Sequence, residues 1–137
     1  VPWHQDLTIS VQQRASVPGY TGWTSKHGYL SVCPPAQVLS GIVTLRIHLD
    51  DATEANGALK VLPGSHLQGV VRKDNEMNTA HGQLVPVPAG GVMLMRPLLF
   101  HSSHRTENNA HRRVIHIELS HVLLPHPLQW AERVKLF

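Results

Sequence analysis

The stretch R-R-V-I-H-I-E-L at residues 112–119 alternates between apolar and polar side chains from Ile115 to Leu119. An alternation with a period of two predicts a β-strand whose two faces differ in chemistry. One face of this strand then carries Arg112, Val114, His116 and Glu118.

The stretch I-V-T-L-R-I-H-L at residues 42–49 repeats this pattern and predicts a second strand. Its polar face carries Thr44, Arg46 and His48. Polar residues on strand faces are more often packed interior groups than ligands, and pocket lining is the alternative for His48 and for His116.

Shorter strand patterns and turn signals fill most of the remaining chain. Strands are expected at residues 3–11, 58–62, 83–87 and 92–100, and turns at 51–57, 63–65 and 88–91. The Asn56-Gly57 pair predicts a hairpin between the strand at 42–49 and a partner at 58–62. Because helical periodicity is almost absent, with at most a short helix at 130–137, the sequence predicts an all-β sandwich or open barrel of the jelly-roll kind.

The chain of 137 residues is expected to form one domain. Residues 12–37 are rich in Gly, Pro and Ser and lack a sustained period, so we expect a long active-site loop there, with Trp23 as a core, lid or substrate-contacting residue. Residues 120–137 are expected to form a C-terminal tail.

Composition excludes several classes of protein. The formal net charge of +3 comes from scattered basic residues, which argues against a nucleic-acid partner. No apolar run approaches the roughly 20 residues of a membrane span, and we expect a cytoplasmic protein without a membrane partner. The single cysteine, Cys33, excludes an internal disulfide. The oligomeric state cannot be read from these data.

The pair His4 and Asp6 suggests part of a metal site, because residues two apart on a strand point the same way. One imidazole and one carboxylate are two thirds of the face that holds Fe(II) in non-heme oxygenases. The third ligand is expected to be a histidine from a distant strand. His101, at the end of an apolar strand, is the candidate and His104 its alternative.

An arginine on the same face would complete a site for a dicarboxylate such as 2-oxoglutarate. Arg112 lies eleven residues after His101, at the start of the next strand, and an arginine there can hold a carboxylate through two hydrogen bonds. Arg113 is the alternative, and strand alternation allows only one of the two to face the site.

Three motifs in order resemble the phytanoyl-CoA dioxygenase family. They read W-H-Q-D at 3–6, N-G-A-L-K-V-L-P-G-S-H at 56–66 and H-S-S-H-R-T-E-N-N-A-H-R-R-V-I-H at 101–116. The resemblance implies a double-stranded β-helix (a jelly-roll or cupin-like core) and an Fe(II)- and 2-oxoglutarate-dependent dioxygenase. It implies His4, Asp6 and His101 as iron ligands, and Arg112, Ser103 and Arg46 as contacts of the cofactor.

The resemblance further implies O2 as co-substrate and hydroxylation of an unactivated C–H bond in a small molecule, with release of succinate and CO2. Candidate substrate contacts are Trp23, His48 and His116, and the substrate itself cannot be named. Upstream elements of the family are not in the sequence, so the N-terminal part of the usual domain is expected to be missing. Alternatives are a cupin-like metalloenzyme that does not use 2-oxoglutarate and a non-catalytic metal- or ligand-binding β-module.

Overall fold

The structure is a computed structural model that describes residues 1–71 and 77–134. Its described part is almost entirely β, which confirms the predicted fold class. The strands are β1 (Ile9–Val11), β2 (Thr21–Lys26), β3 (Tyr29–Cys33), β4 (Ile42–His48), β5 (Leu59–Val61), β6 (Gln83–Val85), β7 (Val92–Met95), β8 (His101–Ser103) and β9 (Val114–Ser120). The helical segments are α1 (Ala36–Ser40) and the 3-10 turns η1 (Glu54–Asn56), η2 (Ser65–Gln68) and η3 (Thr79–His81).

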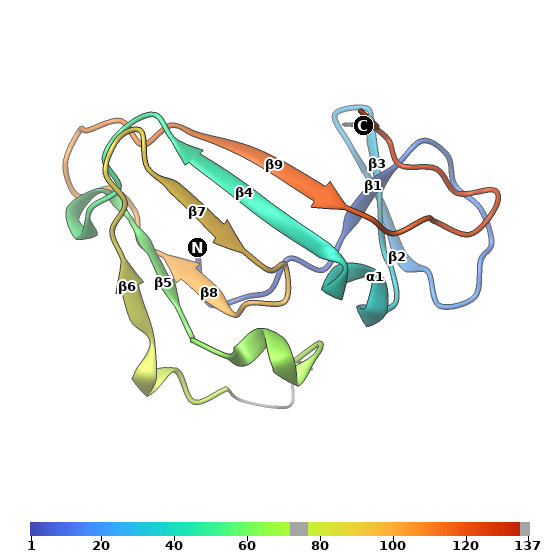
Figure 1. The fold of residues 1–137 in the computed structure, drawn as a ribbon, viewed down its shortest axis with the longest axis horizontal. Helices are drawn as coiled ribbons and strands as arrows, with labels where there is room; N and C mark the ends of the chain where they lie inside the picture. Colours follow the sequence, from blue (N-terminus) through green and yellow to red (C-terminus); the bar gives the residue numbers. More distant parts are fainter. Residues whose placement is uncertain (72–76, 135–137) are drawn as a thin grey trace.

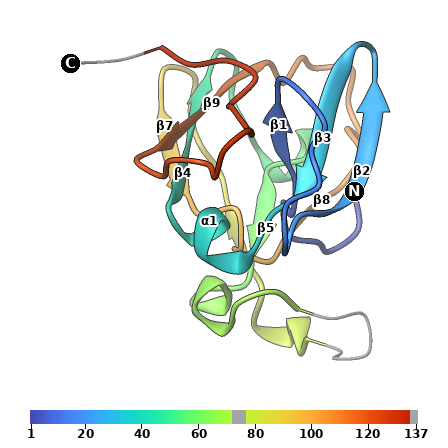
Figure 2. The same cartoon turned by 90° about the vertical axis from the view of Figure 1, so that its right-hand side faces the viewer.

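The strands form three antiparallel sheets with the orders β7-β4-β9, β6-β5-β8 and β1-β3-β2 (Figure 1). The first two form the jelly-roll body, and the third lies at one end beside α1, as the perpendicular view in Figure 2 also shows. An isolated bridge between His4 and His101 attaches the N-terminal segment to the free edge of β8.

The two stretches with the clearest alternation pair with each other along their whole length. In the β4–β9 ladder, Thr44 lies opposite Glu118, Arg46 opposite His116, and His48 opposite Val114. Thr44 is 1 % exposed and His48 3 %, so the polar face of β4 points into the body of the protein.

Apolar residues fill the space between the two body sheets and the space under the end sheet. Leu59 and Val61 of β5 pack with Met95 of β7. A larger core lies below the end sheet and is formed by Ile9, Val11, Tyr20, Val32, Val38, Leu39, Ile42, Leu98 and Leu128.

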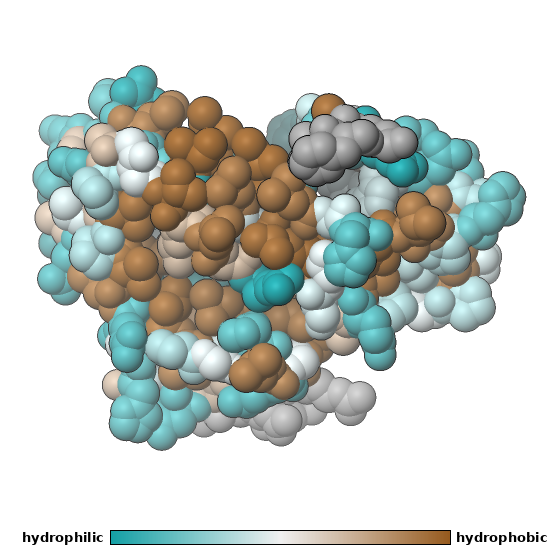
Figure 3. Space-filling model, viewed as in Figure 1, coloured by the Kyte–Doolittle hydropathy of each residue, from teal (hydrophilic) through white to brown (hydrophobic). Residues whose placement is uncertain are grey.

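The opposite face of β7-β4-β9 is apolar and exposed. Leu94 is 65 % exposed and Val92 54 %, and Ile115, Ile117 and Leu119 of β9 are each more than a third exposed. Figure 3 shows these apolar side chains gathered on the side of the molecule where the three strands lie. Within the described residues, no helix is long and apolar enough to cross a membrane.

Several expected elements differ from the structure. Strand 58–62 does not form a hairpin with 42–49, because β5 pairs with β6 and β8 while β4 pairs with β7 and β9. The Asn56-Gly57 turn therefore carries the chain from one sheet to the other. In the expected strand 3–11 only Ile9–Val11 is a strand, and the expected strand 92–100 ends at Met95.

The expectation of a long loop at 12–37 is also wrong. This segment contains β2, β3 and the start of α1, and β2 and β3 pair through the register Lys26 with Tyr29. The turn between them has positive φ at both central residues, His27 and Gly28, as a two-residue hairpin requires. Residues 130–134 do not form the expected short helix, and 135–137 lie outside the described residues.

Candidate metal centre

Backbone hydrogen bonds place the three candidate ligands beside one another. The N–H of His4 donates to the carbonyl of His101 at 2.9 Å, and the N–H of His101 donates to the carbonyl of His4 at the same distance. The N–H of Asp6 donates to the carbonyl of Pro97, also at 2.9 Å. The chain direction at the ligands is therefore fixed by β-type pairing between segments almost a hundred residues apart.

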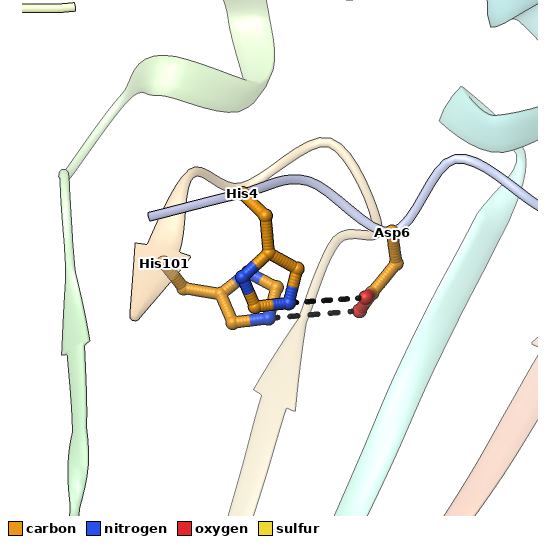
Figure 4. A group of neighbouring side chains, drawn as sticks. All are labelled: His4, Asp6 and His101. Atoms are coloured by element: carbon orange, nitrogen blue, oxygen red, sulfur yellow. Dashed lines mark ion pairs between the residues drawn. The ribbon is translucent and has the colours of Figure 1, made fainter. Parts of the chain in front are cut away.

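The side chains of His4, Asp6 and His101 converge on one point (Figure 4). Their ligand atoms all lie within 4.8 Å of one another. The His4 Nε2 atom lies 3.7 Å from Asp6 Oδ1, and His101 Nε2 lies 3.8 Å from Asp6 Oδ2. These distances are too long for hydrogen bonds, so the three groups face one another without satisfying one another.

Both histidines use the other ring nitrogen for a backbone contact. His4 Nδ1 lies 2.8 Å from the carbonyl oxygen of Pro2, and His101 Nδ1 lies 2.7 Å from that of Leu99. A carbonyl only accepts, so each Nδ1 carries the proton when the ring is neutral. Each Nε2 then presents a lone pair toward Asp6, which is the tautomer that a metal ligand needs.

Burial favours the neutral form of the deeper ligand. The His101 side chain is only 6 % exposed, whereas those of His4 and Asp6 are each 37 % exposed. Burial is the largest cause that lowers the pKa of His101. The site therefore has a closed side at His101 and an open side at His4 and Asp6.

Gln5, between the two N-terminal ligands, ties this segment to the fold. It is 8 % exposed, and its amide nitrogen donates to the carbonyls of Gly69 at 2.9 Å and Leu98 at 2.7 Å. Its amide oxygen accepts from the N–H of Val71 at 2.8 Å. The sequence pattern gives no signal for this residue. In the structure, the hydrogen bonds of Gln5 fix the backbone that carries His4 and Asp6 on either side of it.

We predict that Gln5→Leu lowers metal affinity by about 10- to 100-fold, the usual effect of losing a group that orients ligands. Calorimetric titration of Zn(II) into the metal-free chain measures it. Gln13→Leu is the matched control, because the Gln13 side chain donates to the Pro127 carbonyl away from the ligands. Equal affinity of Gln5→Leu and the wild type would contradict the positioning role.

The wall formed by β4 contains buried polar atoms without partners among the described residues. They are the Thr44 hydroxyl, Arg46 Nε and both ring nitrogens of His48. Buried polar groups in proteins are normally hydrogen-bonded. A row of unpaired groups on the inner face of a strand therefore indicates a lining for a polar ligand.

Arg112 and Arg113 have opposite surroundings. Arg113 makes a two-fold contact with Asp50, with Nε 2.9 Å from Oδ2 and Nη2 2.8 Å from Oδ1. Arg112 has no ion pair among the described residues, and its charge lowers the pKa of Arg46 and of His48, in each case after burial as the larger cause. Of these two arginines, Arg112 is therefore the one that is free to bind a ligand beside the β4 wall.

Gly57 lets the chain pass close to the backbone of His104. A Cβ at this position would lie 2.5 Å from the carbonyl oxygen of His104 and 3.7 Å from Arg112 Nε, and Gly57 has φ +85°. Glycine is thus required both by the turn and by the close approach of the 104–112 segment.

The other predicted site residues fall in different places. Ser103 lies two residues after His101 on β8, so both side chains have the same strand face. His116 lies on β9 opposite Arg46. Trp23 packs against the large core below the end sheet, with the Arg14 guanidinium 5.5 Å from its ring centroid. His104 is exposed and is not in the group of candidate ligands.

Glu118 was not among the predicted site residues, although it shares the strand face of Arg112 and His116. Burial, and then the charge of Asp6, raise the pKa of its carboxyl group. The alternation in 112–119 was the signal that could have identified it.

His48 predicts a pH dependence of stability. Burial, then Arg46 and Arg112, lower its pKa, so the unfolded chain binds a proton that the folded chain excludes. Its contribution is present above the ordinary pKa of about 6.5 and is lost as the pH falls toward the lowered folded-state value. We expect His48→Gln to reduce the loss of unfolding free energy between pH 7.5 and 5.5 by about 1 kcal/mol in urea titrations of the metal-free chain. If His48→Gln lost as much unfolding free energy between these pH values as the wild type, the prediction would be contradicted.

A jelly roll that brings two histidines and one carboxylate together has the arrangement by which double-stranded β-helix proteins can hold a single metal ion. The chain belongs to the phytanoyl-CoA dioxygenase family, whose model matches residues 1–114. The resemblance stated from the motifs is thereby confirmed.

Comparison with solved structures also finds proteins that are similar to this chain in fold. AviO1 from Streptomyces viridochromogenes Tue57 is 30% identical, with a TM-score of 0.57 over 91% of this chain and 45% of that one. EvdMO1 is 28% identical, with a TM-score of 0.55 over 88% of this chain and 23% of that one. The apo structure of ThoJ, a non-heme monooxygenase, shares the fold at 19% identity, with a TM-score of 0.53 over 72% of this chain and 41% of that one.

The chain thus spans less than half the length of each of these structures. No curated protein matches the sequence.

Proposed function

We propose that this chain carries the catalytic core of an Fe(II)- and 2-oxoglutarate-dependent dioxygenase that hydroxylates a small molecule. The convergence of His4, Asp6 and His101 within 4.8 Å carries the proposal. Two neutral imidazoles and one carboxylate bind Fe(II) on one side and leave other positions for ligands. Bound iron would use O2 and 2-oxoglutarate to hydroxylate a C–H bond of the substrate, with release of succinate and CO2.

The donor set fits this metal. Both Nε2 atoms face the Asp6 carboxylate, and both rings are oriented by carbonyl contacts through Nδ1. Burial lowers the pKa of His101 and so favours its neutral form. His4 and Asp6, each about a third exposed, stand on the side from which further ligands reach the metal.

The surroundings also fit an anionic cofactor. Arg46 and Arg112 are close enough for the charge of Arg112 to lower the pKa of Arg46. Two neighbouring cations repel each other until an anion lies between them. Arg112 is proposed to hold the distal carboxylate of 2-oxoglutarate, with Ser103 beside it, and Arg46 Nε and His48 offer donors that no described residue accepts.

The other roles remain those proposed from the sequence. His116 stands at the edge of the same inner face and is proposed to contact substrate. Trp23, which packs against the large core below the end sheet, remains a proposed substrate contact. O2 is the proposed co-substrate.

The test is succinate formation from 2-oxoglutarate by the purified chain with Fe(II), ascorbate and O2. Enzymes of this kind turn over 2-oxoglutarate slowly without their substrate, and we expect succinate above a metal-free control. Chelation of iron should remove it and Fe(II) should restore it. Metal binding with no 2-oxoglutarate binding would instead favour a cupin-like metalloenzyme, and binding of both without turnover would favour a non-catalytic module.

A further inference from the structure

Two polar side chains of β9 lie beside the metal centre and have no role in holding the metal or the cofactor. The inner face of the β7-β4-β9 sheet runs from Met95 through Thr44 to Glu118, and its next row runs from Met93 through Arg46 to His116. Met95 and Thr44 are buried, whereas the side chains of His116 and Glu118 are 41 % and 42 % exposed. The inner face therefore opens to solvent at β9.

This opening leads into a groove of about 1120 Å³. His116 and Glu118 line one part of it, and the aromatic side chains of Tyr29 and Trp130 line another. The groove follows β9, which within the described residues pairs with β4 on one side and has no strand on the other. Polar groups on one wall and aromatic surface on another are usual in sites for small organic ligands.

The pair lies on the inner sheet face that carries Arg46 and is near enough to the metal ligands for their charges to act on it. Burial and then the charge of Arg46 lower the pKa of His116, with smaller contributions from Asp6 and His101, and burial and then the charge of Asp6 raise the pKa of Glu118. A groove ligand touching the pair would thus lie on the same inner face as Arg46, on the side of the sheet toward the proposed iron site.

The hydrogen-bonding capacity of the pair is unused. His116 Nε2 lies 3.9 Å from Glu118 Oε1, which is beyond hydrogen-bond length. Neither side chain has a hydrogen-bond partner among the described residues. Two carboxylate oxygens offer acceptors only, and a neutral imidazole offers one acceptor and one donor.

We infer that His116 and Glu118 form a substrate-recognition site that takes a hydrogen-bond-donating group, a hydroxyl or an ammonium, of the molecule to be hydroxylated. This inference rests on the proposed function and names the polar class of its substrate. An anionic group would face both Glu118 and Asp6, and a group that only accepts would leave the carboxylate unpaired, which costs affinity.

The test uses three probes with one six-membered ring: cyclohexanol, cyclohexylammonium and cyclohexanone. Each is titrated into 15N-labelled chain loaded with Zn(II) and 2-oxoglutarate, which cannot turn over, and into metal-free chain. We expect saturable shifts of the His116 and Glu118 amide signals with at least one donor probe, at least about tenfold tighter than with cyclohexanone. The tighter of the two donor probes identifies hydroxyl or ammonium.

Variants separate recognition from structure. Glu118→Gln should lower the affinity for cyclohexylammonium by about tenfold. Glu118→Leu should lower the affinity for both donor probes by at least as much. The matched control is Ile115→Gln, on the opposite face of the same strand and outside the groove lining, which should leave all three affinities unchanged. Amide spectra of each variant verify folding, and His116→Phe provides a second route if Glu118→Leu does not fold.

The inference is overturned if cyclohexanone binds as tightly as the donor probes, if neither donor probe saturates, or if Glu118→Leu retains their affinity. Failure of the proposed function gives a different result, because it is seen as absence of metal and 2-oxoglutarate binding before any probe is added. Donor-selective binding to a chain that does not bind 2-oxoglutarate would retain the recognition site and remove the oxygenase proposal.

Discussion

Asp6→Ala is expected to lower Fe(II) affinity by more than about 100-fold and to abolish succinate formation. Loss of groups that merely orient ligands costs 10- to 100-fold, so loss of a ligand itself should cost more. Asp6 is also the group that both Nε2 atoms face, at 3.7 and 3.8 Å, and its removal leaves two histidines without the carboxylate. Anaerobic calorimetric titration of Fe(II) measures the change.

His104→Ala is the control for this variant. His104 is exposed and lies outside the group of candidate ligands, although it is three residues from His101. The His104→Ala variant should bind Fe(II) with the affinity of the wild type. Retention of wild-type affinity by Asp6→Ala, or its loss in His104→Ala, would show that the metal is held elsewhere.

Arg112→Leu is expected to raise the dissociation constant for 2-oxoglutarate by about 10- to 100-fold while leaving Fe(II) affinity within a few-fold. A charge-assisted hydrogen-bonded pair with a carboxylate is worth about 1.5–3 kcal/mol, which corresponds to this range. Arg46 and His48 keep some attraction for the anion, so binding should be weakened rather than abolished. Titration of 2-oxoglutarate into the metal-loaded chain gives the constant.

Arg113→Leu is the matched control, since the same residue type at the next position is already engaged by Asp50. Its loss should lower stability slightly and leave the 2-oxoglutarate constant unchanged. The reverse result, with Arg113→Leu weakening 2-oxoglutarate and Arg112→Leu without effect, would reassign the cofactor contact.

The sequence predicted the central strands and the all-β class because both depend on local alternation. In the predicted strands at 42–49 and 112–119, polar and apolar side chains lie mostly on opposite faces. These strands correspond to β4 and β9, with bounds that differ by one or two residues. The juxtaposition of His4, Asp6 and His101 was inferred from the same reasoning together with the family resemblance, and the structure brings the three side chains together.

Pairing between distant strands was not predictable in the same way. The Asn56-Gly57 signal specifies a turn, which exists as η1 followed by Gly57 in the left-handed region, but it does not specify which sheet the chain enters next. The β2–β3 hairpin was missed because its turn uses His27-Gly28, whereas asparagine or aspartate is the usual residue before the glycine. Gln5 was missed because its three hydrogen bonds reach residues more than sixty positions away.

The most direct measurement of the central proposal is an anaerobic titration of 2-oxoglutarate into the Fe(II)-loaded chain, followed by visible absorption. A 2-oxoglutarate chelate on a two-histidine, one-carboxylate Fe(II) site gives a weak charge-transfer band. We predict a saturable band in the wild type, none in Asp6→Ala, and a band that needs higher 2-oxoglutarate in Arg112→Leu. Iron binding without any band in the wild type would contradict the account.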